Sequence, residues 1–167
     1  ADITLWTAFD GVANGGDATE SWDNAVLNHD GVSYGAYKMA VTTAPSPQTS
    51  VGTKCDWFPC EDFAGDGYEI SCWVYTNRSL TFLFKGNIRG NGNTQLTNQA
   101  STNLVCPAGQ WTQITSQGVF PLVGDNDQPF DEFQVLPHTV QSQAGDEYLF
   151  DDIRPVSYTH RTLPTTP

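Results

Sequence analysis

Short stretches of alternating apolar and polar residues recur along this chain, and clusters of Gly, Asn, Asp and Pro separate them. A period of two is typical of β-strands that bury one face, and no segment keeps the period of an amphipathic helix. The pattern predicts an all-β fold, a two-sheet antiparallel β-sandwich or jelly roll. Strands are predicted near residues 3–9, 36–42, 67–76, 79–86, 111–120, 131–136 and 147–156, with weaker signals at 49–54, 93–98 and 101–105.

The same alternation assigns side chains to faces. In the strand predicted at 67–76 it places Cys72 in the core and leaves Trp73 and Tyr75 on the opposite face. The next strand buries its even-numbered residues, so its outer residues, Lys85 among them, are predicted to share a face with Trp73 and Tyr75. Large aromatic side chains on a face that is not the core call for a functional explanation.

The length of 167 residues suits one domain, which we place at residues 1–157. Residues 158–167 are rich in Thr and Pro and are predicted to begin a linker to a further domain. The sequence contains no long apolar run, so neither a transmembrane helix nor a retained signal peptide is expected. The abrupt beginning on Ala1 suits a mature N-terminus or a fragment boundary, and we expect a secreted, extracellular protein.

Acidic residues outnumber basic ones by 19 to 7, which gives a net charge of -12. Phosphate binding needs a basic stripe and none is present, so we expect no nucleic-acid partner and, for the same reason, no anionic membrane partner. We also expect a monomer.

The cysteines form an even set, Cys55, Cys60, Cys72 and Cys106, which favours disulfides in an oxidising compartment. Cys55 and Cys60 enclose a short loop with Pro59 that suits a local disulfide, and Cys72 could then pair with Cys106. The alternative is that Cys72 is a buried free thiol. The spacing does not match a structural zinc site.

Acids stand at the end of the first predicted strand and in the last one. Asp10 follows the first strand, and Asp151 and Asp152 lie among apolar residues of the last. If the two strands pair, these acids could share a hard cation such as Ca²⁺. The alternative is that they face water, as acids at strand ends usually do.

Five short motifs together resemble a known group of modules: FDG, GAYKMAV, YEISCWVY, GQWTQI and YLFDDI, within residues 5–156. They are similar to the β-sandwich carbohydrate-binding modules of families four, nine and twenty-two, which have a galactose-binding-like jelly roll. The resemblance implies a structural Ca²⁺ held by Asp10, Asp151 and backbone carbonyls around Tyr37. It also implies that Trp73 lines a polysaccharide-binding cleft on the concave sheet. The segments 55–60 and 86–94 depart from the family pattern and leave the specificity open.

The chemistry of sugar recognition points the same way. Sugar rings stack on flat aromatic side chains, and planar polar side chains bind their hydroxyl groups. The segment 86–94 is predicted to be a mobile loop that forms one wall of the cleft, with Arg89 at its centre. Trp57 could add a second platform or pack beneath its own loop, and each polar side chain could instead be an ordinary solvated one. The predicted carbohydrate-binding residues are Trp57, Trp73, Tyr75, Asn87, Arg89, Gln95 and Gln134.

The sequence thus predicts a non-catalytic module that binds a plant cell-wall polysaccharide of the β-glucan, xyloglucan or xylan type and targets a covalently attached catalytic domain. The acidic surface favours a neutral polymer. One alternative is a small glycosidase or lyase, for which Glu69 and Glu132 are the candidate acids. The other is a structural or adhesion domain.

Overall fold

The computed structural model describes residues 6–9, 15–46, 51–56, 58–60, 65–90, 94–99, 103–120 and 130–158, and these residues contain strands and turns but no helix. The described residues therefore contain no helix that is long and apolar enough to cross a membrane. The strands are β1 (Trp6–Phe9), β2 (Asp17–Leu27), β3 (Tyr34–Thr43), β4 (Val51–Cys55), β5 (Phe58–Pro59), β6 (Gly67–Thr76), β7 (Leu80–Gly90), β8 (Thr94–Gln99), β9 (Leu104–Cys106), β10 (Thr112–Val119), β11 (Phe130–Thr139) and β12 (Glu147–Tyr158).

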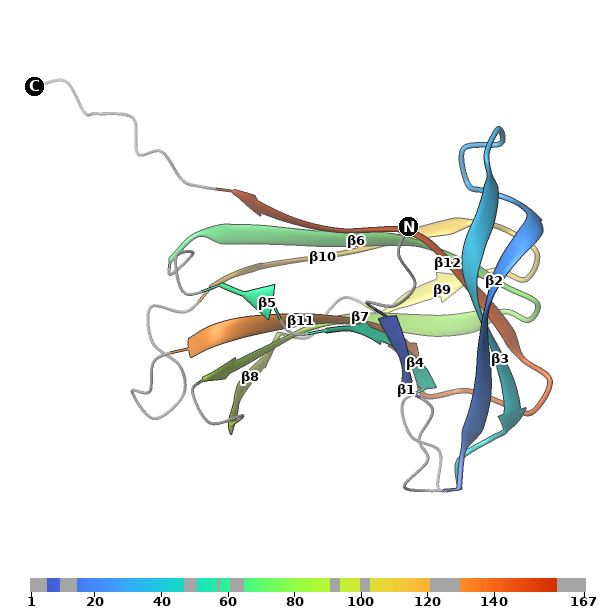
Figure 1. The fold of residues 1–167 in the computed structure, drawn as a ribbon, viewed down its shortest axis with the longest axis horizontal. Helices are drawn as coiled ribbons and strands as arrows, with labels where there is room; N and C mark the ends of the chain where they lie inside the picture. Colours follow the sequence, from blue (N-terminus) through green and yellow to red (C-terminus); the bar gives the residue numbers. More distant parts are fainter. Residues whose placement is uncertain are drawn as a thin grey trace, which may run out of the picture.

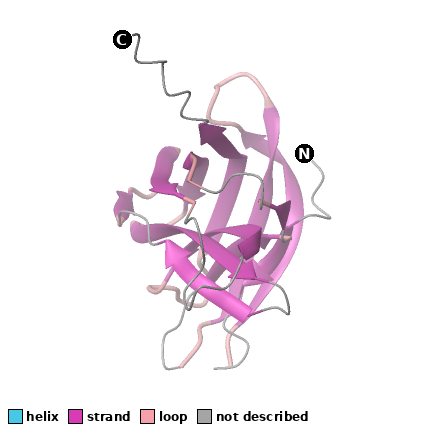
Figure 2. Cartoon of the chain, turned by 90° about the vertical axis from the view of Figure 1, so that its left-hand side faces the viewer, coloured by secondary structure: helices cyan, strands magenta, loops and turns pink. Residues whose placement is uncertain are grey.

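The strands form two antiparallel sheets packed face to face (Figure 1). Sheet A has the order β1-β4-β11-β7-β8, with β5 beside β11 and β9 beside β7, and sheet B has the order β10-β6-β12-β3-β2. Figure 2 shows the strands of both sheets running around a common interior. The predicted β-sandwich is confirmed.

The core lies between the sheets and follows the predicted alternation. Along β6 and β7 every second side chain is buried, which confirms the faces assigned to Cys72 and Trp73. Aromatic rings fill the space between the layers, where Phe82 of sheet A meets Tyr148 of sheet B edge to face at 5.3 Å between ring centroids.

Two glycines let aromatic rings rest directly on the backbone. A Cβ atom on Gly86 would lie 2.5 Å from the Phe133 ring, and one on Gly118 would lie 2.5 Å from the Tyr68 hydroxyl. Tyr68 and Phe133 themselves touch, with ring centroids 5.1 Å apart. These small residues therefore let both sheets close on one aromatic cluster.

Three segments differ from the sequence prediction. The short strand β5 lies in a stretch for which no strand was predicted. β2 was not predicted, because as an edge strand it is exposed along most of its length and its sequence shows no apolar alternation. β7 continues to Gly90 and pairs with β8, so the expected loop at 86–94 is largely a β-hairpin. Arg89 consequently lies on a strand, not on a mobile loop.

The first and last strands do not pair. β1 pairs with β4 in sheet A, whereas β12 lies between β6 and β3 in sheet B. β12 pairs with β6 along most of its length and with β3 over its first four residues, and within the described part of the chain it does not pair with β1. The predicted pairing that would bring Asp10 to Asp151 is wrong, and Asp10 itself lies outside the described residues.

None of the four cysteines forms a disulfide, so the predicted disulfides are not formed in this structure. The Cys55 Sγ accepts a hydrogen bond of 3.1 Å from the Val135 backbone N–H, which turns it toward β11. Burial raises the pKa of the Cys55 and Cys106 thiols to about 11 and that of Cys72 well above its usual value.

Candidate functional site

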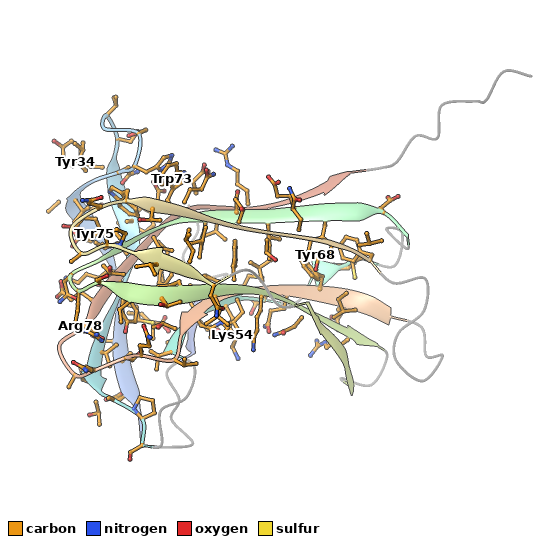
Figure 3. The ribbon with its side chains drawn as sticks, turned by 180° about the vertical axis from the view of Figure 1, so that it is seen from behind. Tyr34, Lys54, Tyr68, Trp73, Tyr75 and Arg78 are labelled. Atoms are coloured by element: carbon orange, nitrogen blue, oxygen red, sulfur yellow. The ribbon has the colours of Figure 1, made fainter. Side chains whose placement is uncertain are left out.

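The predicted site residues fall on two opposite faces of the sandwich. Trp73 and Tyr75 project from the outer face of sheet B, whereas Asn87, Arg89 and Gln134 belong to strands of sheet A. Figure 3 shows Trp73 above sheet B, Tyr68 between the layers and Lys54 on the far side of sheet A. The prediction that Trp73 and Lys85 share a face is wrong, because the chain crosses from one sheet to the other between β6 and β7.

A row of polar side chains crosses the centre of sheet A on its outer face. Asn87 of β7 stands opposite Gln134 of β11, and Arg89 stands opposite Glu132. The Asn87 Nδ2 donates to the Gln134 Oε1 at 3.3 Å, and the Arg89 Nε donates to the Glu132 Oε2 at 2.5 Å. We call these four residues the polar row.

Hydrogen bonds fix the polar row in place. The Gln134 Nε2 donates to the Cys55 carbonyl at 2.8 Å, which locks the amide orientation and leaves its oxygen turned toward Asn87. The Asn87 Oδ1 is buried and has no hydrogen-bond partner among the described residues. A buried acceptor without a donor is unfavourable, so this atom is suited to a hydroxyl donor supplied from outside the chain.

The outer face of sheet A is concave. Figure 1 shows β8 and the β1–β4 pair, which are the two ends of this sheet, below β7 and β11 on the side away from sheet B. Leu136 and His138 lie on this outer face in register with Lys85 and Leu83, yet they are only 6% and 1% exposed. Outward side chains of an open sheet are normally far more exposed, so this part of the face is enclosed by the protein.

His138 is neutral in this setting. Burial, and secondarily the charge of Lys85, lowers the pKa of His138 to about 4, although the bond to a backbone carbonyl opposes this shift. Its Nδ1 donates to the Leu136 carbonyl at 3.3 Å, since a carbonyl can only accept. Beside the polar row, the face therefore carries an uncharged imidazole and the ammonium group of Lys85.

The outer face of sheet B carries a different cluster, formed by His29, Trp73 and Asp151. The imidazole of His29 stacks on Trp73 with ring centroids 4.6 Å apart and an angle of 12° between the rings. Its Nδ1 lies 2.7 Å from the Asp151 Oδ2. We call this set the His29 cluster. It was missed from the sequence because nothing in the local pattern brings residue 29 to positions 73 and 151.

Neighbouring contacts show that the His29 cluster anchors the β2–β3 hairpin. The Trp111 Nε1 donates to the Leu27 carbonyl at 2.9 Å, and Trp111 packs on Tyr75 at 5.6 Å between ring centroids. One face of Trp73 is thus occupied by His29, and Tyr75 is covered in part by Trp111. These aromatic side chains have partners within the chain.

The described residues include only part of the predicted calcium site, because Asp10 lies outside them. Asp151 uses one oxygen toward His29 and the other to accept the Asp152 backbone N–H. The backbone of Tyr37 is paired with Phe150 in the sheet. Within the described ranges no group of three or more His, Cys, Asp or Glu side chains could hold a metal ion. Calcium stays a prediction, which melting with and without a chelator would test.

The two remaining predicted site residues are placed only in part. Gln95 lies on β8 in register with Arg89, beside the polar row. Trp57 lies outside the described residues, although β5, which directly follows it, pairs with β11 at Glu132 and Phe133.

Comparison with known proteins gives a match in structure but not in sequence. No protein-family model matches the chain, and no curated protein does. Among solved structures, the CBM22-2 xylan-binding domain of Xyn10C from Paenibacillus barcinonensis has a TM-score of 0.66 at 14% identity, over 94% of each chain. A structure described as CBM4 has a TM-score of 0.56 at 16% identity, over 93% of this chain and 96% of that one.

A third similar structure is larger. The N-terminal endo-1,4-β-D-xylanase 10B of Clostridium thermocellum, with its CBM22-1 and GH10 modules complexed with xylohexaose, has a TM-score of 0.60 at 16% identity. The similarity covers 92% of this chain and 26% of that chain. At these identities the comparisons show the fold, the β-sandwich of carbohydrate-binding modules.

Proposed function

We propose that the chain is a non-catalytic module that binds a plant cell-wall β-glycan of the glucan, xyloglucan or xylan type on the concave outer face of sheet A. The observation that carries this proposal is the polar row, in which paired positions of β7 and β11 present amide and guanidinium groups side by side. The shared fold with structures described as xylan-binding supports it.

The polar row suits a sugar chain for a physical reason. Adjacent hydroxyl groups on a pyranose ring act as donors and acceptors at once, and planar amides bind them in pairs. The Asn87 Oδ1 has no donor among the described residues, and Gln134 is held in one orientation by the Cys55 carbonyl. Such a site loses little side-chain entropy when the ligand binds.

Stacking residues complete the proposed site. Trp57 directly precedes β5, which pairs with β11 beside the polar row, and we propose that it supplies the flat apolar surface for a sugar ring. We keep Gln95 as a proposed site residue because its backbone on β8 lies in register with Arg89. Trp73 and Tyr75 are left out of this site, because they lie on the opposite face with partners of their own.

The placement of acids supports a binder over a glycosidase. Glu69 lies on the outer face of sheet B, where its Oε2 accepts from Gln117 at 2.6 Å, whereas Glu132 lies on sheet A. Two catalytic carboxylates must flank the same sugar within roughly 5 to 10 Å. Acids on opposite sides of a sandwich cannot do so.

The proposal extends to the parent protein. The structurally similar CBM22-1 module occurs in one chain with a GH10 module. We infer that this module likewise targets a covalently attached catalytic domain, in a secreted, extracellular protein, and that it acts as a monomer.

Affinity electrophoresis tests the proposal with soluble xylan, mixed-linkage glucan, xyloglucan and mannan, together with assays for released reducing sugar. We expect at least one polymer to retard the protein without release of reducing ends. Asn87→Ala and Arg89→Ala should each weaken binding roughly tenfold, as is typical of contacts at the centre of a site. Gln117→Ala, on the opposite face, is the matched control.

Other outcomes would redirect the proposal. Reducing sugar released in proportion to the amount of protein would indicate an enzyme, and retardation by none of the polymers would favour a structural or adhesion domain. Loss of binding in Trp73→Ala with normal binding in Asn87→Ala and Arg89→Ala would move the site to sheet B.

A further inference from the structure

The charge of the outer face of sheet A differs from that of the whole protein. The chain carries a net charge of -12. The described strands of this sheet place the basic side chains of Lys54, Lys85 and Arg89 on this face, together with the acidic side chain of Glu132. Figure 3 shows Lys54 on this side of sheet A. A basic surface on an acid-rich protein points to a ligand with negative charge.

Lys85 stands apart from the other basic residues. Lys38 pairs with Glu147 at 2.9 Å, Arg78 with Asp146 at 2.7 Å, and Arg89 with Glu132 at 2.5 Å. No carboxylate among the described residues lies within ion-pair distance of Lys85, although it is half-buried.

The described neighbours of Lys85 on this face carry no negative charge. Leu136 stands opposite in register, Asn87 follows on the same face of β7, and His138 next to Leu136 is uncharged. Amide and imidazole groups can orient a bound anion, but they do not balance an ammonium charge. The missing counter-charge is therefore available to a ligand that lies along the polar row.

Repulsion from the many acidic residues of the protein does not prevent an anionic group from reaching Lys85. The Debye length is about 8 Å at physiological ionic strength, so acids elsewhere on the surface are largely screened from the concave face. A carboxylate that touches Lys85 is screened much less. Local charge thus outweighs the net charge, and a ligand with sparse negative groups on a neutral backbone is the best match.

We propose that the concave face of sheet A recognises a β-glycan decorated with uronic acid, with Lys85 pairing with the uronate carboxylate while the polar row binds the neutral backbone. This inference rests on the proposed function. It refines the sequence-based preference for a neutral polymer, since the backbone stays neutral and only the side groups carry charge.

Isothermal titration calorimetry tests the proposal with glucuronoxylan and with the same polymer after chemical reduction of its carboxyl groups. We expect the wild-type protein to bind the native polymer about 5- to 10-fold more tightly than the reduced one, the range of a single charged contact. Lys85→Met should bring this ratio close to 1, and Lys85→Arg should preserve most of it. Added salt should lower the wild-type ratio.

Lys38→Met is the matched control, because Lys38 lies on the outer face of sheet B. For this variant, the ratio of the affinities for native and reduced glucuronoxylan should equal that of the wild type. A wild-type ratio near 1, with clear binding of both polymers, would overturn the uronate inference and leave the proposed function intact. A preference that survives in folded Lys85→Met would also overturn it. If the protein binds neither form of the xylan, nor mixed-linkage glucan or xyloglucan run beside them, both proposals are overturned.

Discussion

At the scale of single residues, Asp146 makes the most completely bonded charged contact of the described chain. It is only 4% exposed and accepts hydrogen bonds from the Arg78 Nε at 2.9 Å and Nη2 at 2.7 Å, and from the Gln143 N–H at 2.8 Å. The Tyr148 hydroxyl adds a fourth bond at 3.1 Å. This set closes the turn between β11 and β12.

These bonds set the ionisation of Asp146. Burial alone would raise its pKa, but the Arg78 guanidinium and the Gln143 N–H together hold the pKa of Asp146 below its ordinary value. A carboxyl whose pKa is lower in the folded state stabilises the fold above its unfolded pKa of about 3.9 and loses this contribution as the pH falls through the folded value.

Asp146→Asn should therefore lower the free energy of unfolding at neutral pH by about 1–3 kcal/mol, because it removes the charge that pairs with Arg78. The difference from the wild type should shrink as the pH falls below about 4, because the unfolded chain then binds a proton at Asp146 that the folded chain binds only at lower pH. Urea unfolding at neutral and acidic pH measures both effects. A difference that does not change with pH would contradict the role assigned to the ionised carboxylate.

At the scale of elements, sequence alternation predicted the buried faces of β6 and β7 because each strand buries one side. It could not place β6 and β7 in different sheets. The sequence of the turn at 77–79 fits a hairpin within one sheet equally well. In the structure this turn is held by distant residues, since the Asn77 Nδ2 donates to the Gly145 carbonyl at 2.9 Å and the Asn77 Oδ1 accepts from the Glu147 N–H at 3.0 Å. Those contacts span about seventy residues and leave no local pattern.

The candidate site, like the strands, was predictable only in part. Asn87, Arg89 and Gln134 were identified by residue type, and the structure brings them onto one face. Trp73 and Tyr75 were grouped with them because β6 and β7 are adjacent in sequence and, for Trp73, because of the resemblance to carbohydrate-binding modules. His29 carried no signal, since its role depends on a hairpin whose first strand has no apolar alternation.

The β2–β3 hairpin gives a prediction at this scale. Trp73→Ala removes the ring on which His29 stacks, so we expect the free energy of unfolding to fall by about 1–3 kcal/mol and amide exchange in residues 28–33 to accelerate. Affinity for the glycan should not change. Gln113→Ala, exposed and in register with Trp73, is the control. Weaker glycan binding with unchanged exchange would contradict this role.

At the scale of the whole molecule, the buried His138 links stability to pH. Its pKa is lowered to about 4 by burial and by Lys85, whereas an unfolded His titrates near about 6.5. Between these values the unfolded chain binds a proton that the folded chain does not. Stability should therefore rise with pH from about 4 to 6.5.

The contribution of His138 to this rise is on the order of 3 kcal/mol. Urea unfolding at intervals across this range should show the slope in the wild type, and His138→Gln should flatten it. Equal slopes in both proteins would assign the effect to other groups, such as the carboxylates.

The positions of the lysines determine how the protein should be attached to a surface. Of the three lysines in the sequence, Lys54 and Lys85 lie on the concave face of sheet A, and Lys38 lies on sheet B in an ion pair with Glu147. Amine-reactive coupling would therefore modify the proposed binding face and hide it against the support. Coupling through carboxylates of sheet B, such as Glu69, would instead present the concave face to the polymer. We therefore expect a sensor chip or column made by amine coupling to retain less ligand than one made by coupling through sheet B.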